Sequence, residues 1–453
     1  MKIGVIPRNY YEYIAVFIGH LGVFIAALSM TWTSPILPKL TSLEDNPLHR
    51  KITPGEESLL GSISISGGLV GTFLAGYLAK TYGRKPIFIF LAIPFLVSFT
   101  IMAFSTNFWE LFIARIIGGF ALGGFFTVDT MYFAEISENS NRGFLGTAMT
   151  CFINFGLLLV LVIGPWTPFV YFHLILATFP AVFIVLVYLF LPESPYYLVQ
   201  KDYNEAESCL KKLRGTADVK SELSSIRESL DEENQVSLKD VLRNKGLRRG
   251  LLIGCGLVIA QQLSGTAVIM SYGQTIFSEA GGNIPSEIGP IIIAGIQFFV
   301  GFIAPPIVDK SGRKLLLMIS YIGITLAHFI FGSYFLLKNK YGNVGFLSWV
   351  PLASLILYII TYSLGSGPLP WTIIGEIFPM EVKNVATSVC ITVLNVLAFI
   401  FLFGFNLVKD EIGIGATFWI FSAFGMLSTI FIHFIVIETK GKSLSEIQRI
   451  LNT

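Results

Sequence analysis

The charged side chains of this chain recur as two sets in the same order. Each set opens with a basic pair after a glycine and continues with a glutamate, a basic residue seven positions later and a final glutamate: Arg84, Lys85, Glu135, Arg142 and Glu193 in the first set, Arg313, Lys314, Glu376, Lys383 and Glu438 in the second. Equivalent residues stand about half of the 453 residues apart (84 and 313, 135 and 376, 193 and 438). Carboxylates and basic groups in such an order form ion pairs, and their repetition predicts two homologous halves.

A second kind of chemistry is neutral hydrogen bonding. Gln261 and Gln262 place two amides side by side in an apolar stretch, and Ser264 and Gly265 follow after one leucine. Amides both donate and accept hydrogen bonds, as a ligand rich in hydroxyl groups requires, and an aromatic ring covers its apolar faces. Trp371, which follows two glycines and two prolines, is the candidate ring, in a segment that we expect to act as a hinge.

The sequence supports neither catalysis nor cofactor binding. It contains no phosphate-binding loop and no hydrolytic arrangement, and its histidines are scattered without metal-ligand spacing. The net charge of +2 comes without a basic run that would bind nucleic acid. We therefore expect no catalytic residue, no metal and no cofactor.

Composition places the chain in a membrane. Hydrophobic residues make up 53% of it and charged residues 13%, against roughly 25% charged in a soluble domain. Apolar runs of about 20 residues recur along the chain, each long enough to cross a bilayer, and all must be helices because lipid satisfies no backbone polar group. About twelve such spans are expected, at 13–36, 57–79, 87–105, 108–134, 143–164, 170–191, 248–278, 286–308, 315–337, 347–374, 385–408 and 415–437.

The distribution of Lys and Arg predicts the orientation. With both termini on one side, that side carries 24 of the 31 basic residues, the opposite side carries six, and Arg115 lies within a span. The excess predicts that both termini are cytosolic. The first span is longer than the apolar region of a signal peptide, so we do not expect it to be cleaved. The plasma membrane is the expected location because we identify no organelle signal.

The expected fold class is an all-α integral membrane protein with two six-helix bundles. A polar stretch with helical charge spacing separates them, for which a disordered linker is the alternative. Ser443 and Glu446 are spaced as a capping box at the start of a short helix in the tail. The expected domains are an N-terminal bundle at 1–191, an intracellular helical domain at 192–247, a C-terminal bundle at 248–437 and a cytosolic tail at 438–453.

Six motifs stand in sugar-porter order. They are GRK at 83–85 and at 312–314, PESP at 192–195, QQLSG at 261–265, GPLPW at 367–371 with Glu376, and ETKG at 438–441. The chain resembles the sugar porters of the major facilitator superfamily, which include the facilitative glucose transporters, and in particular the insect trehalose-transporter-like branch. The resemblance covers nearly the whole chain. It implies alternating access, in which two bundles rock about a central sugar site and open to one side at a time.

The resemblance also implies roles for the motif residues. Gln261 and Gln262 would contact sugar, with hydrogen bonding between helices as the alternative. Trp371 would line the cavity and move with the cytosolic gate, unless it is packed as core. The charged sets would latch the two halves together on the cytosolic side, whereas anchoring by the positive residues alone is the simpler alternative.

Several ligand positions depart from the glucose-transporter pattern. Where the glucose-transporter pattern has a glutamine, an asparagine and a glutamate, this chain has Thr150, Ala267 and Ser363. Where the pattern has a further asparagine and an Asn-Trp pair, this chain has Gln297 and Leu394–Asn395. These changes remove hydrogen-bonding groups and enlarge the pocket, so glucose should bind weakly. A larger sugar such as trehalose, or another polar solute, stays open. The candidate substrate residues are Gln261, Gln262, Gln297, Trp371, Asn395, Thr150 and Asn154.

Ion coupling gives mixed signals. Proton-coupled sugar porters carry an aspartate in the first span, whereas residues 22–37 here contain no acid, which predicts uniport. Asp129, however, lies within the fourth span, where it is a structural partner, a substrate ligand or a proton carrier. Arg115 in the same span is read as structural rather than as a sugar contact.

The alternatives to a uniporter are a proton-coupled symporter and a non-transporting sugar sensor, although sensors tend to have a longer tail. The expected transport unit is a monomer in the bilayer.

Overall fold

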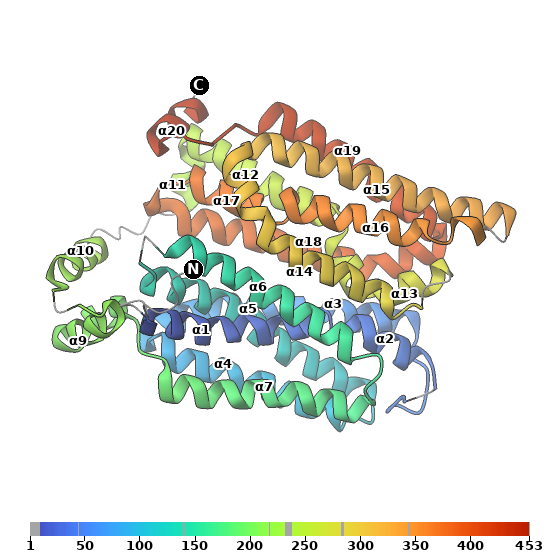
Figure 1. The fold of residues 1–453 in the computed structure, drawn as a ribbon, viewed down its shortest axis with the longest axis horizontal. Coiled ribbons are helices and arrows are strands. Elements are labelled where there is room, and N and C mark those ends of the chain that lie inside the picture. The colour runs from blue at the N-terminus through green and yellow to red at the C-terminus, as the bar shows by residue number, and fades with distance from the viewer. Residues whose placement is uncertain are drawn as a thin grey trace, which may run out of the picture. The chain divides into compact units, whose positions relative to one another are not determined.

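The computed structural model describes residues 10–43, 45–138, 141–216, 218–231, 238–281, 285–342 and 345–452. Every regular element among these residues is a helix (Figure 1). The elements, in chain order, are α1 (Tyr10–Met30), α2 (Thr33–Thr41), α3 (Pro54–Tyr82), α4 (Arg84–Ala103), α5 (Phe108–Ile136), α6 (Arg142–Ile163), α7 (Phe169–Phe190), α8 (Pro195–Val199), α9 (Tyr203–Arg214), α10 (Lys220–Asp231), α11 (Leu238–Arg243), α12 (Lys245–Leu263), α13 (Thr266–Ala280), α14 (Ile288–Ser311), α15 (Arg313–Tyr341), the 3-10 turn η1 (Gly345–Leu347), α16 (Val350–Thr361), the π-helix η2 (Tyr362–Ser366), α17 (Leu369–Ile377), α18 (Met380–Ile412), α19 (Ile414–Ile435) and α20 (Leu444–Asn452).

The predicted all-helical membrane fold is confirmed. Among the described residues, 11 helical segments are long and apolar enough to cross a bilayer. Three of these spans are built from more than one element: α1 with α2, α12 with α13, and η1 to α17. The remaining predicted span, 286–308, coincides with α14, whose apolar part Ile288–Ala304 is shorter. Helices satisfy their own backbone groups, which lipid cannot do.

The helices form two compact units. Unit 1 comprises residues 1–30, 63–159 and 166–234, and unit 2 comprises residues 31–62, 160–165 and 235–453. The segments 31–62 and 160–165 thus associate with the second half of the chain. One contact of this kind is the backbone N–H of Gln274 in α13, which donates to Ser34 Oγ in α2 at 3.2 Å. The domain boundaries expected from the sequence remain a prediction.

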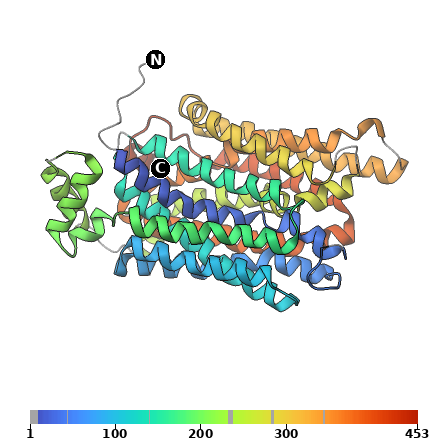
Figure 2. The ribbon, with the colours of Figure 1, turned by 60° about the horizontal axis from the view of Figure 1, so that its bottom comes forward.

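In unit 1, α1 packs against α5, α7 and α4. Small residues allow α5 to approach α3 closely: a Cβ on Gly119 would lie 2.0 Å from the carbonyl oxygen of Ser64, and one on Gly123 would lie 2.0 Å from that of Gly68. Any side chain there would push the two helices apart. Figure 2 shows α9 and α10 beyond the helix ends of this unit, on the side where α1 begins.

In unit 2, α15 packs along α19 and α16, and α12 packs against α18 and α20 (Figure 1). The capping box predicted for the tail is confirmed. The backbone N–H of Ser443 donates to Glu446 Oε2 at 2.8 Å, and that of Glu446 donates to Ser443 Oγ at 3.3 Å. The helix α20 then buries Ile447 and Leu451, so the tail is docked on α12 and α17.

Candidate substrate site and ion-pair networks

The chain breaks between α12 and α13 within one membrane span. Gly265 adopts the left-handed conformation (φ 75°) that favours glycine. Ser264 Oγ donates to the carbonyl oxygen of Gln261 at 2.6 Å. The carbonyl oxygen of Ser264 accepts a hydrogen bond from His328 Nε2 of α15 at 2.9 Å. Because a helix break in a membrane frees backbone carbonyls, His328 satisfies a group that lipid would leave unpaired.

Gln261 is held by the backbone of a second broken helix. Its amide nitrogen Nε2 donates to the carbonyl oxygens of Ser366 at 3.0 Å and Gly367 at 2.9 Å. These carbonyls lie at the end of the π-helix η2, where a wider helical turn exposes them. The donor side of Gln261 therefore joins two helices, as the alternative interpretation of this residue predicted. Its role as a sugar contact remains a prediction.

Two side-chain oxygens, one in α12 and one in η2, are buried without a recorded partner. They are Oε1 of Gln262 and Oγ of Ser363, both on half-buried residues. A buried acceptor that lacks a hydrogen-bond donor destabilises a protein by about 1–3 kcal/mol. A hydroxyl group of a ligand would supply such a donor.

The π-helix η2 is fixed by α15. Ser320 Oγ donates to the carbonyl oxygen of Thr361 at 2.7 Å and accepts from the backbone N–H of Ser366 at 3.0 Å. Ser366 Oγ donates to Tyr321 Oη at 2.8 Å. A Cβ on Gly365 would lie 2.5 Å from Ser320 Cβ, so only glycine fits this approach. The widened turn is thus a built feature, followed by the prolines at the start of α17.

The remaining candidate substrate residues lie on several helices. In unit 2, Trp371 on α17 has 37% of its surface exposed, Gln297 lies half-buried on α14, and Asn395 on α18 donates to the carbonyl oxygen of Ile391 in its own helix at 2.9 Å. In unit 1, α6 carries Thr150, which is exposed, and Asn154, which is buried. Each unit thus carries part of the predicted set.

The first charged set forms a cluster in unit 1, where α4 begins. Arg84 Nη2 pairs with Glu135 Oε1 at 2.5 Å, and Ser194 Oγ donates to Glu135 Oε2 at 2.5 Å. Glu193 Oε1 accepts from the backbone N–H groups of Arg84 and Ser194, each at 2.8 Å. Burial raises the pKa of Glu193, although the N–H donors act against it. Lys85 Nζ donates to the carbonyl oxygen of Tyr188 at 3.1 Å.

The second set repeats this arrangement in unit 2, where α15 begins. Arg313 Nη2 pairs with Glu376 Oε1 at 2.9 Å. Glu438 accepts from the backbone N–H groups of Arg313 at 3.0 Å and Lys314 at 3.1 Å. Burial acts to raise the pKa of Glu438, but these backbone donors outweigh it and the pKa is lowered. Lys314 Nζ donates to the carbonyl oxygen of His433 at 2.7 Å, the counterpart of the Lys85 contact.

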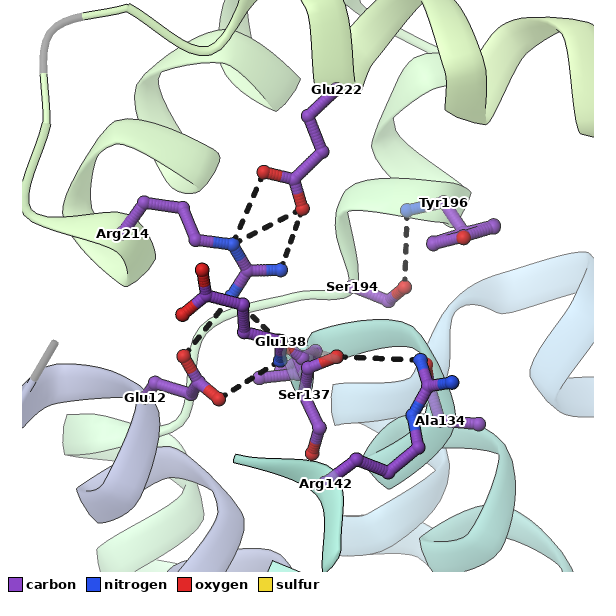
Figure 3. A network of polar contacts seen from close by, with 10 residues as sticks. Glu12, Ala134, Ser137, Glu138, Arg142, Ser194, Tyr196, Arg214 and Glu222 are labelled. Atoms are coloured by element: carbon purple, nitrogen blue, oxygen red, sulfur yellow. Dashed lines mark hydrogen bonds and ion pairs between the residues drawn. The ribbon is translucent and has the colours of Figure 1, made fainter. Parts of the chain in front are cut away.

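The last two members of the sets bind backbone carbonyls. Lys383 Nζ donates to the carbonyl oxygen of Gly375 at 3.2 Å. Arg142 Nη2 lies 3.4 Å from the carbonyl oxygen of Ala134 and 3.5 Å from that of Ser137 (Figure 3). All recorded pairs of the two sets join groups of the same unit. The predicted latch between the two halves therefore remains a prediction.

One charged network was missed from the sequence. Arg214 at the end of α9 binds Glu12 Oε2 of α1 at 3.2 Å through Nη1 and Glu222 Oε1 of α10 at 2.7 Å through Nη2 (Figure 3). Glu12 Oε1 in turn accepts from the backbone N–H of Glu138 at 3.0 Å. Glu12 is fully buried, so the network docks α9 and α10 on the first span. The feature of the sequence that could have indicated this network is Glu12, an acidic residue in the first turn of an otherwise apolar helix.

The two charged residues of the fourth span, α5, have separate partners. Arg115 Nη1 donates to the carbonyl oxygen of Ser29 at 2.9 Å, and its Nη2 donates to Ser64 Oγ at 3.0 Å, which fits the structural role expected for it. Asp129 Oδ2 lies 2.9 Å from His20 Nδ1 of α1. The partner of Asp129 is thus a histidine in the first span. The sequence alone does not reveal this pair, because the two residues are 109 positions apart.

Metal binding receives no support from the part of the chain that the structure describes, where no group of three or more His, Cys, Asp or Glu side chains could hold a metal ion. The chemistry of the site is that of amides, hydroxyl groups and aromatic rings. Such groups bind a neutral, hydroxylated ligand through hydrogen bonds and apolar contact.

Comparisons with known proteins agree with this chemistry. The model of the family "Sugar (and other) transporter" matches residues 17–451. The facilitated trehalose transporter Tret1 of Culex quinquefasciatus is 34% identical over 436 residues, covering 95% of this chain and 83% of the relative. Tret1 of Polypedilum vanderplanki is 33% identical over 447 residues, covering 97% and 88%.

Solved structures share the fold. The inward-open conformation of the xylose transporter XylE from E. coli superposes with a TM-score of 0.82 at 24% identity, covering 97% of this chain and 99% of that one. The human organic anion transporter MFSD10 superposes with a TM-score of 0.65 at 16% identity, covering 93% and 99%. With a family match over nearly the whole chain, this protein belongs to the sugar transporter family of the major facilitator superfamily and is a multi-pass membrane transporter, not an enzyme.

Proposed function

We propose that this transporter is a uniporter that moves a sugar down its own gradient across the plasma membrane by alternating access. Trehalose or a hexose is the substrate, the termini are cytosolic, and the monomer is the transport unit. Two relatives named as facilitated trehalose transporters support the substrate class. The absence of an acid from residues 22–37 supports uniport over proton coupling.

The observation that carries the proposal is the break between α12 and α13. Gln262 Oε1 and Ser363 Oγ are buried acceptors without a recorded partner, and sugar hydroxyl groups would donate to them. Gln261 holds the neighbouring π-helix in place through its amide nitrogen. A sugar bound at these groups would thus be recognised by two broken helices together. Helices interrupted in this way are a common basis of transporter sites.

The same hinge supports a gating role for α17. A π-helix and two prolines precede Trp371, so a local change at η2 would move this ring without unfolding a complete span. We propose that Trp371 covers the sugar on the cytosolic side. The two charged clusters at the starts of α4 and α15 would stabilise the helix ends that meet when that side closes.

Counterflow in proteoliposomes tests the proposal. Vesicles preloaded with unlabelled trehalose, glucose or fructose should take up the labelled form of the transported sugar. Gln262→Ala should reduce uptake by about tenfold, because a lost hydrogen-bond partner contributes about 1–3 kcal/mol. Gln200→Ala is the matched control, since Gln200 is exposed outside the spans, and it should retain wild-type uptake. Absence of counterflow for all three sugars would refute the substrate assignment.

A further inference from the structure

His20 and Asp129 form an enclosed pair inside unit 1. His20 has 0% and Asp129 has 1% of its surface exposed. His20 Nδ1 lies 2.9 Å from Asp129 Oδ2, and His20 Nε2 lies 3.2 Å from the carbonyl oxygen of Leu145 in α6. The pair therefore connects α1, α5 and α6. Asp129 Oδ1 is buried without a recorded partner and would lie 3.0 Å from a Cβ on Gly19.

The geometry fixes the number of protons that the pair holds. A carbonyl oxygen accepts but never donates, so His20 Nε2 carries a hydrogen. One further proton must lie between His20 Nδ1 and Asp129 Oδ2, because two bare lone pairs would repel each other. The pair is then either an imidazolium with a carboxylate or a neutral imidazole with a carboxylic acid. Both forms have a net charge of zero and hold one shared proton.

Loss of that proton would change the pair fundamentally. The one hydrogen left on the imidazole would lie either on Nε2, leaving Nδ1 bare against the carboxylate, or on Nδ1, leaving Nε2 bare against the carbonyl oxygen of Leu145. In both tautomers a net negative charge would stay buried. Apolar surroundings strongly disfavour an uncompensated charge. The contact between α1 and α5 would open or take in water. The shared proton is thus required for the closed packing of these three helices.

Aromatic side chains of the described helices α5 and α6 lie beside the pair. The rings of Phe133 on α5 and Phe152 on α6 lie 5.6 Å and 6.1 Å from the His20 ring. Tyr132 on α5 is a further titratable side chain that interacts with Asp129, and its hydroxyl donates to the carbonyl oxygen of Pro192 at 2.8 Å. No recorded interaction of the described parts of α4, α7 and α9, which also pack on α1, joins a charged side chain to the pair.

We propose that His20 and Asp129 form a binding site for a single proton, and that sugar transport requires this site to be occupied. The proton stays with the pair throughout the transport cycle, because both side chains are enclosed within one unit. It therefore controls the rate of transport without being carried across the membrane. This inference uses the proposed sugar transport only as a readout.

Asp129→Asn separates proton binding from packing. Asparagine has nearly the shape of aspartate, and its amide can donate to Nδ1 of a neutral His20. The hydrogen bonds that join His20 to residue 129 and to the carbonyl oxygen of Leu145 are therefore both retained. The variant cannot lose a proton from the pair. It therefore reproduces the occupied site at every pH.

The experiment measures sugar counterflow in proteoliposomes with the same pH on both sides, from about pH 6 to about pH 10, a range above the ordinary pKa of histidine. Wild-type flux should fall by about tenfold per pH unit above the point of proton loss, the limit for a single proton. Asp129→Asn should give a flat profile. Glu12→Gln is the matched control, because Glu12 on α1 is likewise a buried acid. This variant should keep the wild-type decline of flux with pH. A flat wild-type profile, or the same decline in Asp129→Asn, would overturn the proposal.

Infrared difference spectroscopy of the purified protein provides a test that needs no sugar. Alkaline titration of the wild type should remove one proton, seen as changes in carboxyl and imidazole bands that are absent from Asp129→Asn. If wild-type vesicles transport no sugar, the proposed function fails while this titration still decides the proton site. If the infrared difference spectra of wild type and Asp129→Asn on alkaline titration are identical, the proposed proton site is wrong, whether or not the vesicles transport sugar.

Discussion

The amide nitrogen of Gln261 lies 2.9 Å from the carbonyl oxygen of Gly367, within the turn that leaves the π-helix η2. A glutamine expected to contact sugar thus also binds the backbone of the hinge. This links the site to the segment that would move during transport. Sugar binding next to Gln261 would then act directly on the hinge.

Gln261→Glu should impair transport more than Gln261→Ala. Glutamate has the size of glutamine but places an acceptor against the carbonyl oxygens of Ser366 and Gly367, so it repels them. Alanine removes only the amide donor, and leaving the two carbonyl oxygens without it costs about 1–3 kcal/mol of stability. Glutamate removes the same donor and in addition introduces a negative charge. Initial rates of counterflow measure the order of the two variants. Equal loss in both would mean that the contact with η2 does not matter.

His328→Phe should weaken sugar affinity more than it lowers protein yield. The ring would fit among Tyr358 and Phe418, which lie 4.9 Å and 5.5 Å from the His328 ring. The carbonyl oxygen of Ser264, however, would lose its donor, and the break beside Gln261 would shift. We expect a KM raised by about tenfold, corresponding to about 1.4 kcal/mol, with a smaller change in maximal rate.

His173→Phe is the control for this prediction. His173 is also a buried histidine, but its Nδ1 lies 2.7 Å from the carbonyl oxygen of Phe169 in its own helix. Its replacement should leave KM unchanged. If His328→Gln, which retains a side-chain donor, does not recover part of the affinity lost in His328→Phe, a positioning role for His328 is wrong.

Gly365→Ala should disrupt the hinge, because the added Cβ would lie 2.5 Å from Ser320 Cβ and 2.8 Å from the carbonyl oxygen of Leu316. Flux should fall strongly while the protein still inserts into the membrane. Gly404→Ala has no neighbour within 4 Å of the added carbon and should be neutral or slightly stabilising, since alanine favours helix. Transport rates and thermal unfolding of both variants decide the matter. Normal flux in Gly365→Ala would show that η2 tolerates rearrangement.

Arg214→Ala should destabilise the protein by about 3–5 kcal/mol, because it leaves the fully buried Glu12 without its ionic partner. Thermal unfolding in detergent should show a midpoint lowered by several degrees. Lys211→Ala is the control: Lys211 pairs with Glu207 on the exposed surface of the same helix, and such pairs contribute about 0–1 kcal/mol. Equal midpoints for the two variants would remove Arg214 from the docking of α9.

Periodic and repeated features of this protein could be predicted from its sequence. Apolar runs gave the spans, and the capping box at Ser443 and Glu446 was visible from spacing alone, because such features depend on residues close in sequence. The duplicated basic pairs at Arg84 and Arg313 predicted two similar halves, whereas the ion pairs expected between the halves remain a prediction. The partners within the two charged clusters are distant, yet the repetition shows which residues belong together.

The missed contacts are between residues far apart in sequence and without a repeat. His20 and Asp129 are 109 positions apart, Glu12 and Arg214 are 202 apart, and Ser264 and His328 are 64 apart. His20, Asp129 and His328 each look like an isolated polar residue in an apolar helix, whereas Arg214 is one of several charged residues of α9. Only the packing of the helices decides which of them meet, and a single sequence does not carry that information. The π-helix at 362–366 overlaps the segment 365–371, whose glycines and prolines predicted a hinge but not a π-helix.

The steady-state level of sugar in proteoliposomes with an imposed inward proton gradient distinguishes uniport from proton-coupled transport. For a uniporter, labelled trehalose or hexose should reach the external concentration and stay there, with or without the gradient, because no ion moves with the sugar. Accumulation above the external concentration that disappears when the proton gradient is collapsed would contradict uniport.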